Sequence, residues 1–268
     1  MVAKVVRSSP DAAVVDLEDA VAPSDKETAR RTAVDAIADL EVPRGTVVLL
    51  RVNPPGSPWF ADDVAAAADS AASGVVLPKL EAPAQLAELR RELADRGRGD
   101  AVVVAGMETA RGVDDCRELL SGGVDAAYFG AEDYIADLGG RRTPGGEEVL
   151  YARSRVCLAA RLAEVAGIDQ VVVAVHDDER FIADAEQARA MGFQGKICIH
   201  PRQVDLAHRV FTPSAEEVER ARAVLAAGRD GVGVVDGQMI DDVHLRMATA
   251  VLHRAGQRCP QPPGSPPR

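Results

Sequence analysis

Acidic side chains follow short aliphatic runs at several points of the chain. Glu18 and Asp19 follow the run AAVVDL, Glu108 follows AVVVAGM, and Asp133 lies just beyond AAYFG. Like charges repel one another, and a carboxylate is costly to bury unless a positive group meets it. The pattern therefore indicates a cation, or a cationic substrate group, close to the ends of these runs.

Glu108 and Asp133 form the pair best suited to a metal. They lie 25 residues apart, which is about one βα unit, so parallel strands would place them side by side on one rim. Two carboxylates with open positions suit Mg²⁺, which prefers oxygen ligands and keeps waters that a substrate can displace. Zinc is disfavoured because no His or Cys neighbours the pair.

Cationic and neutral polar residues end other runs. Arg51 is the last polar residue of TVVLLRV, Lys79 ends GVVLPK, and His200 ends KICIH. Each residue alone has an ordinary explanation: Arg51 as the partner of a structural carboxylate, Lys79 as a loop lysine, and His200 as a core histidine hydrogen-bonded to the backbone. Together they place both signs of charge on one predicted rim, as a site for a metal and an oxyanion requires.

Short apolar runs alternate with alanine-rich, charged segments of helical character, such as 24–40 and 84–96. Runs of this length without alternating polarity are typical of strands buried on both faces of a parallel sheet. The pattern predicts an α/β fold of the (β/α)8 TIM-barrel class, with seven of the eight strands. The predicted strands are 12–17, 46–52, 74–79, 101–107, 126–130, 170–175 and 196–200.

The sequence after the last predicted strand no longer alternates between predicted strands and helices. A helix is predicted over 214–228, with Pro213 and Ser214 at its entry, followed by an extended Gly-rich link and a helix over 243–255. The last residues are Pro-rich and are predicted to be disordered. We therefore expect a barrel domain over 1–212, a C-terminal helical lid or oligomerisation segment over 213–256, and a tail over 257–268.

Composition narrows the class of protein. The 268 residues are 47% hydrophobic, enough for a large core, and the net charge of −11 opposes binding to nucleic acid or to anionic membranes. Four scattered cysteines indicate neither a disulfide framework nor a zinc site. No run approaches the roughly 18 apolar residues of a membrane span. These features predict a cytoplasmic protein.

Six motifs in order carry a resemblance: VVDLEDAV, RVNPPGSPW, VVLPKLE, METARGV, YFGAEDYIADLGG and CIHPRQV. The chain resembles the citrate lyase β-subunit-like branch of the HpcH/HpaI aldolase superfamily. The resemblance implies a Mg²⁺-dependent carbon–carbon lyase on a TIM barrel, usually a homotrimer or hexamer. It also implies that the enzyme cleaves or forms thioesters such as citramalyl-CoA or malyl-CoA, with a keto acid and an acyl-CoA or acyl-carrier protein as partners.

The resemblance implies a role for each matching residue. Glu108 and Asp133 match the two metal ligands, and Arg51 matches the arginine that holds the keto-acid or thioester oxygen. Glu18 and Asp19 match acidic residues that steady the waters of the metal and the neighbouring side chains. Glu18 and Arg51 are accordingly expected to be catalytic, and Arg51 and Asp19 to bind substrate.

More distant positions complete the expected site. Lys79, His200 and Pro201 are expected to contact substrate, and Lys4 matches a lysine near the region that binds coenzyme A. The segment DGQMIDDVHLRMA resembles the family's C-terminal lid, which carries an aspartate into the site of a neighbouring subunit. Asp241 holds that position and is the candidate acid/base. The proline that usually follows is absent.

Three alternatives remain open. The chain could be an HpaI-like aldolase of free 2-keto-3-hydroxy acids, a citryl-carrier-protein lyase β subunit in a larger complex, or a non-catalytic paralogue that binds thioesters. The motifs LEDAV and GAED favour the citrate lyase-like branch. Family members begin with a strand and an FxPG-like loop, whereas residues 1–11 resemble the helix that follows, so the missing eighth strand is expected to be the family's first.

Overall fold

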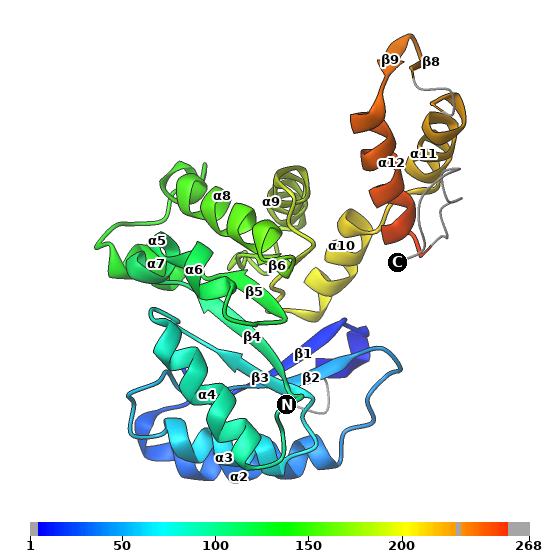
Figure 1. Ribbon diagram of the computed structural model, residues 1–268. Helices are drawn as coiled ribbons and strands as arrows, with labels where there is room; N and C mark the ends of the chain where they lie inside the picture. Colours follow the sequence, from blue (N-terminus) through cyan, green and yellow to red (C-terminus); the bar gives the residue numbers. More distant parts are fainter. Residues whose placement is uncertain (1–4, 229–231, 257–268) are drawn as a thin grey trace. The chain divides into compact units, whose positions relative to one another are not determined.

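Seven strands form one parallel sheet in which each strand pairs with the next along the chain. The computed structural model describes residues 5–228 and 232–256 (Figure 1). The sequential order of strands, with helices between them, confirms the predicted α/β fold of the TIM-barrel class. The strands are β1 (Ala12–Asp16), β2 (Val47–Arg51), β3 (Gly74–Leu77), β4 (Val102–Met107), β5 (Ala126–Phe129), β6 (Ala166–Asp169) and β7 (Gly195–Lys196).

Helices join the strands, as the predicted βα alternation requires. Both long helices expected from the sequence, over 24–40 and 84–96, are present as α2 and α4. The helical elements of this part are η1 (Val6–Ser8), η2 (Pro23–Asp25), α2 (Lys26–Ala38), α3 (Phe60–Asp69), α4 (Pro83–Asp95), α5 (Ala110–Asp114), α6 (Cys116–Leu120), α7 (Ala131–Asp137), α8 (Glu147–Leu162), α9 (Asp178–Met191) and α10 (Pro201–Phe211).

The strands bury side chains on both faces, which explains their continuous apolar runs. Side chains alternate along a strand, so Leu50 and Leu77 pack in the large core with the helices. Leu49, Val76 and Tyr128 form a smaller apolar cluster on the opposite, inner face. The inner face is therefore apolar in its middle, and polar side chains lie near the carboxyl ends of the strands.

The sixth strand lies four residues earlier than predicted. The run QVVVAV at 170–175 is not a strand, and β6 is Ala166–Asp169 instead. Asp169 is fully buried because Arg153 and Lys196 each donate hydrogen bonds of 2.7 Å to its carboxylate. In the run itself, Val173 is 57% exposed. The apolar run follows the strand, and a paired charge occupies the strand's end.

The chain divides into two compact units, Met1–Ala207 and His208–Arg268. The boundary falls within α10, five residues before the position expected from the sequence. The second unit contains α11 (Ala215–Ala227), β8 (Gly233–Val235), β9 (Gln238–Ile240) and α12 (Asp242–Arg254), with a small core of its own. Ser214 caps α11 as predicted, by accepting a hydrogen bond from the backbone N–H of Glu217.

Two sequence predictions concern the remainder. The tail predicted to be disordered, 257–268, lies outside the described residues. Within 5–228 and 232–256, none of the helices is both long and apolar enough to cross a bilayer.

Candidate active site

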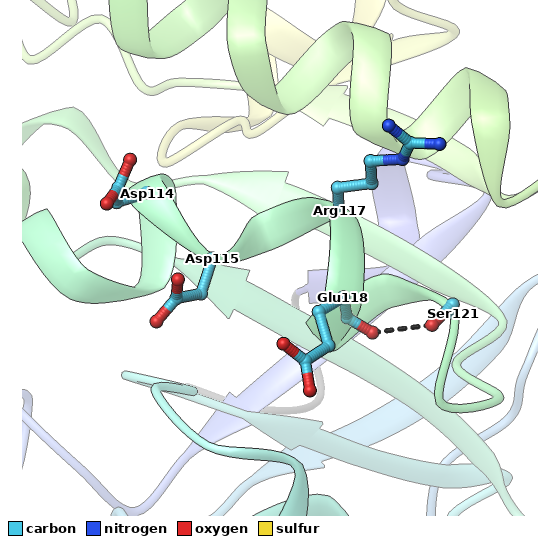
Figure 2. A pocket seen from close by; sticks show the side chains of 5 residues that line it. All are labelled: Asp114, Asp115, Arg117, Glu118 and Ser121. Carbon is cyan, nitrogen blue, oxygen red and sulfur yellow. Dashed lines mark hydrogen bonds between the residues drawn. The ribbon is translucent and has the colours of Figure 1, made fainter.

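A pocket on α5 and α6 is lined by none of the residues that were predicted for the functional site. Its lining side chains lie on α5 and α6 or at the caps of α6, not at strand ends: Asp114, Asp115, Arg117, Glu118 and Ser121 (Figure 2). The Ser121 hydroxyl donates to the backbone oxygen of Glu118 over 2.6 Å, an ordinary helix-end contact. The polar cluster at the ends of β1 to β5 is the better candidate.

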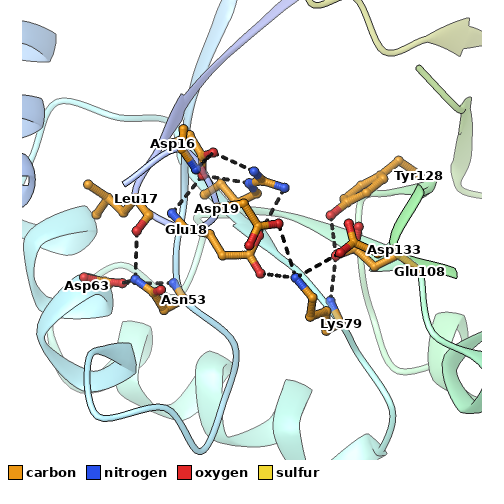
Figure 3. Close-up of polar contacts among 12 residues, drawn as sticks. Asp16, Leu17, Glu18, Asp19, Asn53, Asp63, Lys79, Glu108, Tyr128 and Asp133 are labelled. Atoms are coloured by element: carbon orange, nitrogen blue, oxygen red, sulfur yellow. Dashed lines mark hydrogen bonds and ion pairs between the residues drawn. The ribbon is translucent and has the colours of Figure 1, made fainter. Parts of the chain in front are cut away.

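The buried lysine Lys26 fixes the turn after β1 by hydrogen bonds. Lys26 Nζ donates to the backbone oxygens of Leu17 and Glu18, each over 2.7 Å, and to Asn53 Oδ1 over 2.8 Å. Asn53 in turn donates to the Leu17 oxygen over 2.9 Å (Figure 3). These contacts satisfy buried carbonyl groups and hold the backbone that carries Glu18.

Asp16, the carboxylate of the first aliphatic run, to which the sequence assigned no site role, holds the planar fork of Arg51. Register pairs these two strand-end residues, and Arg51 Nε and Nη2 donate to the Asp16 carboxylate over 2.7 and 2.6 Å. Burial alone would raise the pKa of Asp16, but the hydrogen bonds and charge of Arg51 outweigh it and lower that pKa. Arg51 Nη1 also lies 3.1 Å from Glu18 Oε2.

Lys79 lies at the centre of the cluster. Its Nζ is 2.5 Å from Glu18 Oε1 and 3.5 Å from both Asp19 Oδ2 and Asp133 Oδ1 (Figure 3). Burial alone would lower the pKa of Lys79, but the hydrogen bond to Glu18 and the charges of Glu18, Asp133 and Glu108 raise it above its usual range. The ammonium is therefore a fixed positive charge among carboxylates.

Glu108 is the most buried carboxylate of the cluster. Its Oε1 accepts hydrogen bonds from the Tyr128 hydroxyl over 2.8 Å and from the Lys79 backbone N–H over 2.9 Å. Burial is the main cause that raises the pKa of Glu108 to about 7, and the charges of Asp133 and Glu18 add to it. Sequence analysis did not select Tyr128, which orients this carboxylate.

Two glycines make room for the Glu108 side chain. A Cβ at Gly106 would lie 2.5 Å from the Tyr128 hydroxyl oxygen and 2.8 Å from Glu108 Oε1. A Cβ at Gly130 would lie 2.5 Å from the Cβ of Glu108. Both distances are too short for real atoms, so glycine is required here for close approach rather than for a special backbone angle.

The donor set fits a magnesium ion. Glu108 and Asp133 repel each other, and Glu18 Oε2 is buried without a hydrogen bond, so a cation would relieve all three. Within the described part of the chain, no three His, Cys, Asp or Glu side chains converge as a complete protein cage would require. Magnesium commonly takes one or two carboxylates and fills its other positions with water and substrate.

The remaining predicted site residues are His200, Pro201, Lys4 and Asp241. His200 follows β7 and packs edge-on against His176, with ring centroids 5.9 Å apart, and Pro201 begins α10. Lys4 lies outside the described residues. Asp241, in the second unit, caps α12 by accepting from the Val243 N–H over 3.0 Å.

Comparisons with known proteins identify the family. Residues 1–201 match the family model described as HpcH/HpaI aldolase/citrate lyase, and residues 150–257 match one described as a carbon–carbon bond lyase of the TIM-barrel fold. The first match covers most of the chain. It confirms the resemblance inferred from the six motifs.

Relatives agree along nearly the whole chain. A citrate lyase subunit beta-like protein of Deinococcus radiodurans is 48% identical, over 94% of this chain and 92% of the relative. The citrate lyase subunit beta of Escherichia coli K12 is 34% identical, over 91% of this chain and 85% of the relative.

A solved structure shows the same arrangement of elements. The protein CitE of Mycobacterium tuberculosis, solved in complex with magnesium, acetoacetate and coenzyme A, is 35% identical and has a TM-score of 0.77. The similarity covers 91% of this chain and 89% of that one. This chain therefore belongs to the HpcH/HpaI aldolase/citrate lyase family, and it is an enzyme of the carbon–carbon lyase class.

Proposed function

We propose that the enzyme is a Mg²⁺-dependent lyase that cleaves or forms the carbon–carbon bond of a 3-hydroxyacyl thioester. Malyl-CoA and citramalyl-CoA are examples, and the products are a keto acid and an acyl-CoA. The observation that carries the proposal is one rim with two adjacent carboxylates, Glu108 and Asp133, and a fixed guanidinium, Arg51. The CitE complex with magnesium, a keto acid and coenzyme A supports it.

Glu108 and Asp133 would hold the magnesium. When bound, the ion supplies Lewis-acid stabilisation of the keto or enolate oxygen. Tyr128 and the Lys79 N–H both hold Glu108 Oε1, so that Oε2 is the oxygen left for the metal. Asp133 is on the first turn of α7, and its side chain is 36% exposed, so its carboxylate is accessible to a metal ion.

Arg51 would stabilise the oxygen that gains charge as the bond breaks. Asp16 occupies the Nε and Nη2 edge of the guanidinium, which fixes its plane, and Nη1 and Nη2 retain further N–H donors. A donor aimed in advance at a developing charge lowers the barrier more than one that must turn toward it. Asp16 is thus a positioning residue for Arg51.

The state of Lys79 favours metal chemistry over an imine mechanism. An amine must lose its proton before it can attack a keto group. The carboxylates around Lys79 raise its pKa and keep it protonated. An aldolase reaction through a lysine imine at this position is therefore disfavoured.

Asp241 is proposed as the acid/base that exchanges a proton with the thioester carbon next to the carbonyl. Its Oδ1 lies 2.7 Å from His244 Nδ1, and this contact lowers the pKa of Asp241. An ionised carboxylate suits removal of a proton in the condensing direction. We further propose that Asp241 acts in a neighbouring subunit of a homo-oligomer.

Mixed oligomers test which subunit supplies Asp241 to a given active site. Asp241→Ala should lower turnover about a hundredfold, within the usual range for a general base. When this variant and Glu108→Ala are dissociated and reassembled together, activity should return. Recovery requires a site with Glu108 from one chain and Asp241 from another. No recovery after verified subunit exchange would assign Asp241 to its own chain or to no catalytic role.

A thioester screen tests the reaction itself. The protein is incubated with short 3-hydroxyacyl-CoA thioesters, with Mg²⁺ or with EDTA, and products are followed by mass spectrometry. We expect a keto acid and a shorter acyl-CoA, with formation abolished by EDTA. Cleavage of free 2-keto-3-hydroxy acids without coenzyme A would instead support the HpaI-like alternative. Turnover that is unchanged in EDTA would reject the metal assignment.

A second candidate is thioester hydrolysis. A (3S)-malyl-CoA thioesterase of Cereibacter sphaeroides is 32% identical, over 91% of this chain and 86% of the relative. In the same screen, hydrolysis would release free coenzyme A and the intact hydroxy acid, with no keto acid. The E. coli relative also keeps open a role as a citrate lyase β subunit, and a carrier-protein thioester in the screen tests it.

A further inference from the structure

One ammonium lies among three carboxylates that come from two separate parts of the fold. Glu18 and Asp19 follow β1, whereas Asp133 is in α7, and Lys79 Nζ is within 3.5 Å of all three. The contact with Glu18 is close at 2.5 Å, and the other two are longer ion pairs at 3.5 Å. Arg51 adds a second positive charge 3.1 Å from Glu18 Oε2 but also pairs with Asp16, so the carboxylates still outnumber the cations.

The backbone of Lys79 is fixed in an unusual conformation. Its φ of +50° lies in the left-handed region, which residues other than glycine, asparagine and aspartate rarely adopt. In this conformation its N–H donates to Glu108 while its Nζ reaches Glu18. Lys79 thus connects Glu108, which follows β4, with Glu18, which follows β1. The left-handed turn at Lys79 places its ammonium at the centre of the carboxylates.

The carboxylates around Lys79 retain capacity for another cation. Glu18 is 3% exposed, and its Oε2 makes no hydrogen bond, although Arg51 Nη1 lies 3.1 Å away. The side chain of Lys79 is 27% exposed, so it has room to turn toward solvent. A divalent ion would bring more charge to the cluster than the ammonium does.

We infer that the Lys79 ammonium is a tethered counter-ion: it occupies the cation position of this cluster in the metal-free enzyme, and Mg²⁺ displaces it. A magnesium ion on Glu108 and Asp133 would compete for Asp133 and would repel the ammonium. Lys79 thereby keeps the carboxylates assembled before the metal arrives, at the expense of metal affinity. The inference rests on the proposed metal site.

Replacing Lys79 by methionine tests the competition directly. Titration calorimetry of the metal-free protein with MgCl₂ should show binding tighter in Lys79→Met by on the order of tenfold, a coupling usual for groups in contact. Without MgCl₂ the variant should melt at a lower temperature than the wild type. At saturating MgCl₂ the two melting temperatures should converge, because the wild-type lysine no longer pairs with the carboxylates.

Two further variants complete the experiment. Arg31→Met removes the same charge from an exposed position of α2 and should leave magnesium affinity unchanged. Lys79→Asn is also neutral and tolerates the left-handed backbone, so it gives the same test if the methionine variant does not fold. Both binding and melting are measured without turnover.

The outcomes are distinct. Affinity that is unchanged or weaker in a folded Lys79 variant would overturn the inference, as would a melting difference that persists at saturating MgCl₂. A wild-type enzyme that binds no magnesium would instead reject the metal site of the proposed function. Tighter binding by the variant together with loss of lyase activity would support the inference and leave the reaction to the thioester screen.

Discussion

Glu108→Gln is expected to lower Mg²⁺-dependent turnover by about a thousandfold or more, since the proposed metal ligand becomes a neutral amide. The amide keeps an oxygen that can accept from Tyr128 and from the Lys79 N–H, so the fold should survive. Steady-state turnover of the proposed thioester and calorimetric magnesium binding measure the loss.

The same substitution should make the metal-free protein more stable at pH 8. The pKa of Glu108 is about 7 in the folded protein, against 4.5 for an ordinary glutamate, so the folded state retains the proton longer. Stability therefore falls as pH rises from about 4.5 to about 7, by about 3 kcal/mol. Glutamine does not ionise, so Glu108→Gln should lack this decline in urea unfolding at pH 5 and pH 8 with EDTA.

Glu118→Gln is the matched control. Glu118 lies exposed on α6, outside the cluster, and its replacement should change neither turnover nor the pH dependence of stability. The assignment of Glu108 would be wrong if Glu108→Gln kept wild-type activity and magnesium affinity. An unchanged decline in stability between the two pH values would show that other groups cause it.

Arg51→Lys is expected to lower kcat/KM by about a thousandfold, near the upper end for removal of one preorganised donor. A lysine offers a compact charge on one nitrogen in place of the planar fork, so it cannot form two parallel bonds with Asp16 and keep a further donor fixed in the same plane for substrate. Kinetics with the proposed thioester measure the effect on catalysis, and thermal unfolding of the same samples measures the effect on stability.

Two comparisons make this result interpretable. Asp16→Asn keeps the guanidinium but loosens its fixed plane, so the loss should be smaller than in Arg51→Lys. Arg31→Lys, at an exposed position on α2, should leave kcat/KM unchanged. Near-normal kinetics in a well-folded Arg51→Lys would reject the role of the guanidinium.

The fold was predictable because its signal is local. Strands buried on both faces need aliphatic residues throughout, and six of the seven runs overlap a strand in the structure. The overlap of the last run, 196–200, is limited to Lys196, because β7 is only Gly195–Lys196. The sixth run failed because β6 ends in Asp169, a residue that ordinarily marks a loop. Its burial depends on Arg153 and Lys196, which are distant in sequence, and no pattern within the run reports those partners.

The site was predictable as far as strand ends define it. Glu108 and Asp133 follow aliphatic runs and Arg51 lies near the end of one, and the ends of these runs must meet on one rim. Asp16 ends β1, and its role was missed because its pairing with Arg51 depends on strand register. Tyr128 lies inside β5, and its role depends on the space beside Gly106.

Two further positions show what spacing does not report. The central place of the Lys79 ammonium depends on a left-handed backbone angle, which composition does not reveal. Asp241 was selected as an acid/base, and the structure adds that it caps α12. The second role is local and could have been anticipated from a polar residue before a helix.

The glycines beside Glu108 have a consequence for the entropy of metal binding. Freezing a glutamate side chain costs up to about 2 kcal/mol of rotational freedom. The side chain of Glu108 packs closely against Gly106 and Gly130, and two hydrogen bonds fix its Oε1. That freedom is lost when the chain folds, so an ion bound at the proposed metal site would meet a carboxylate whose side chain is already confined.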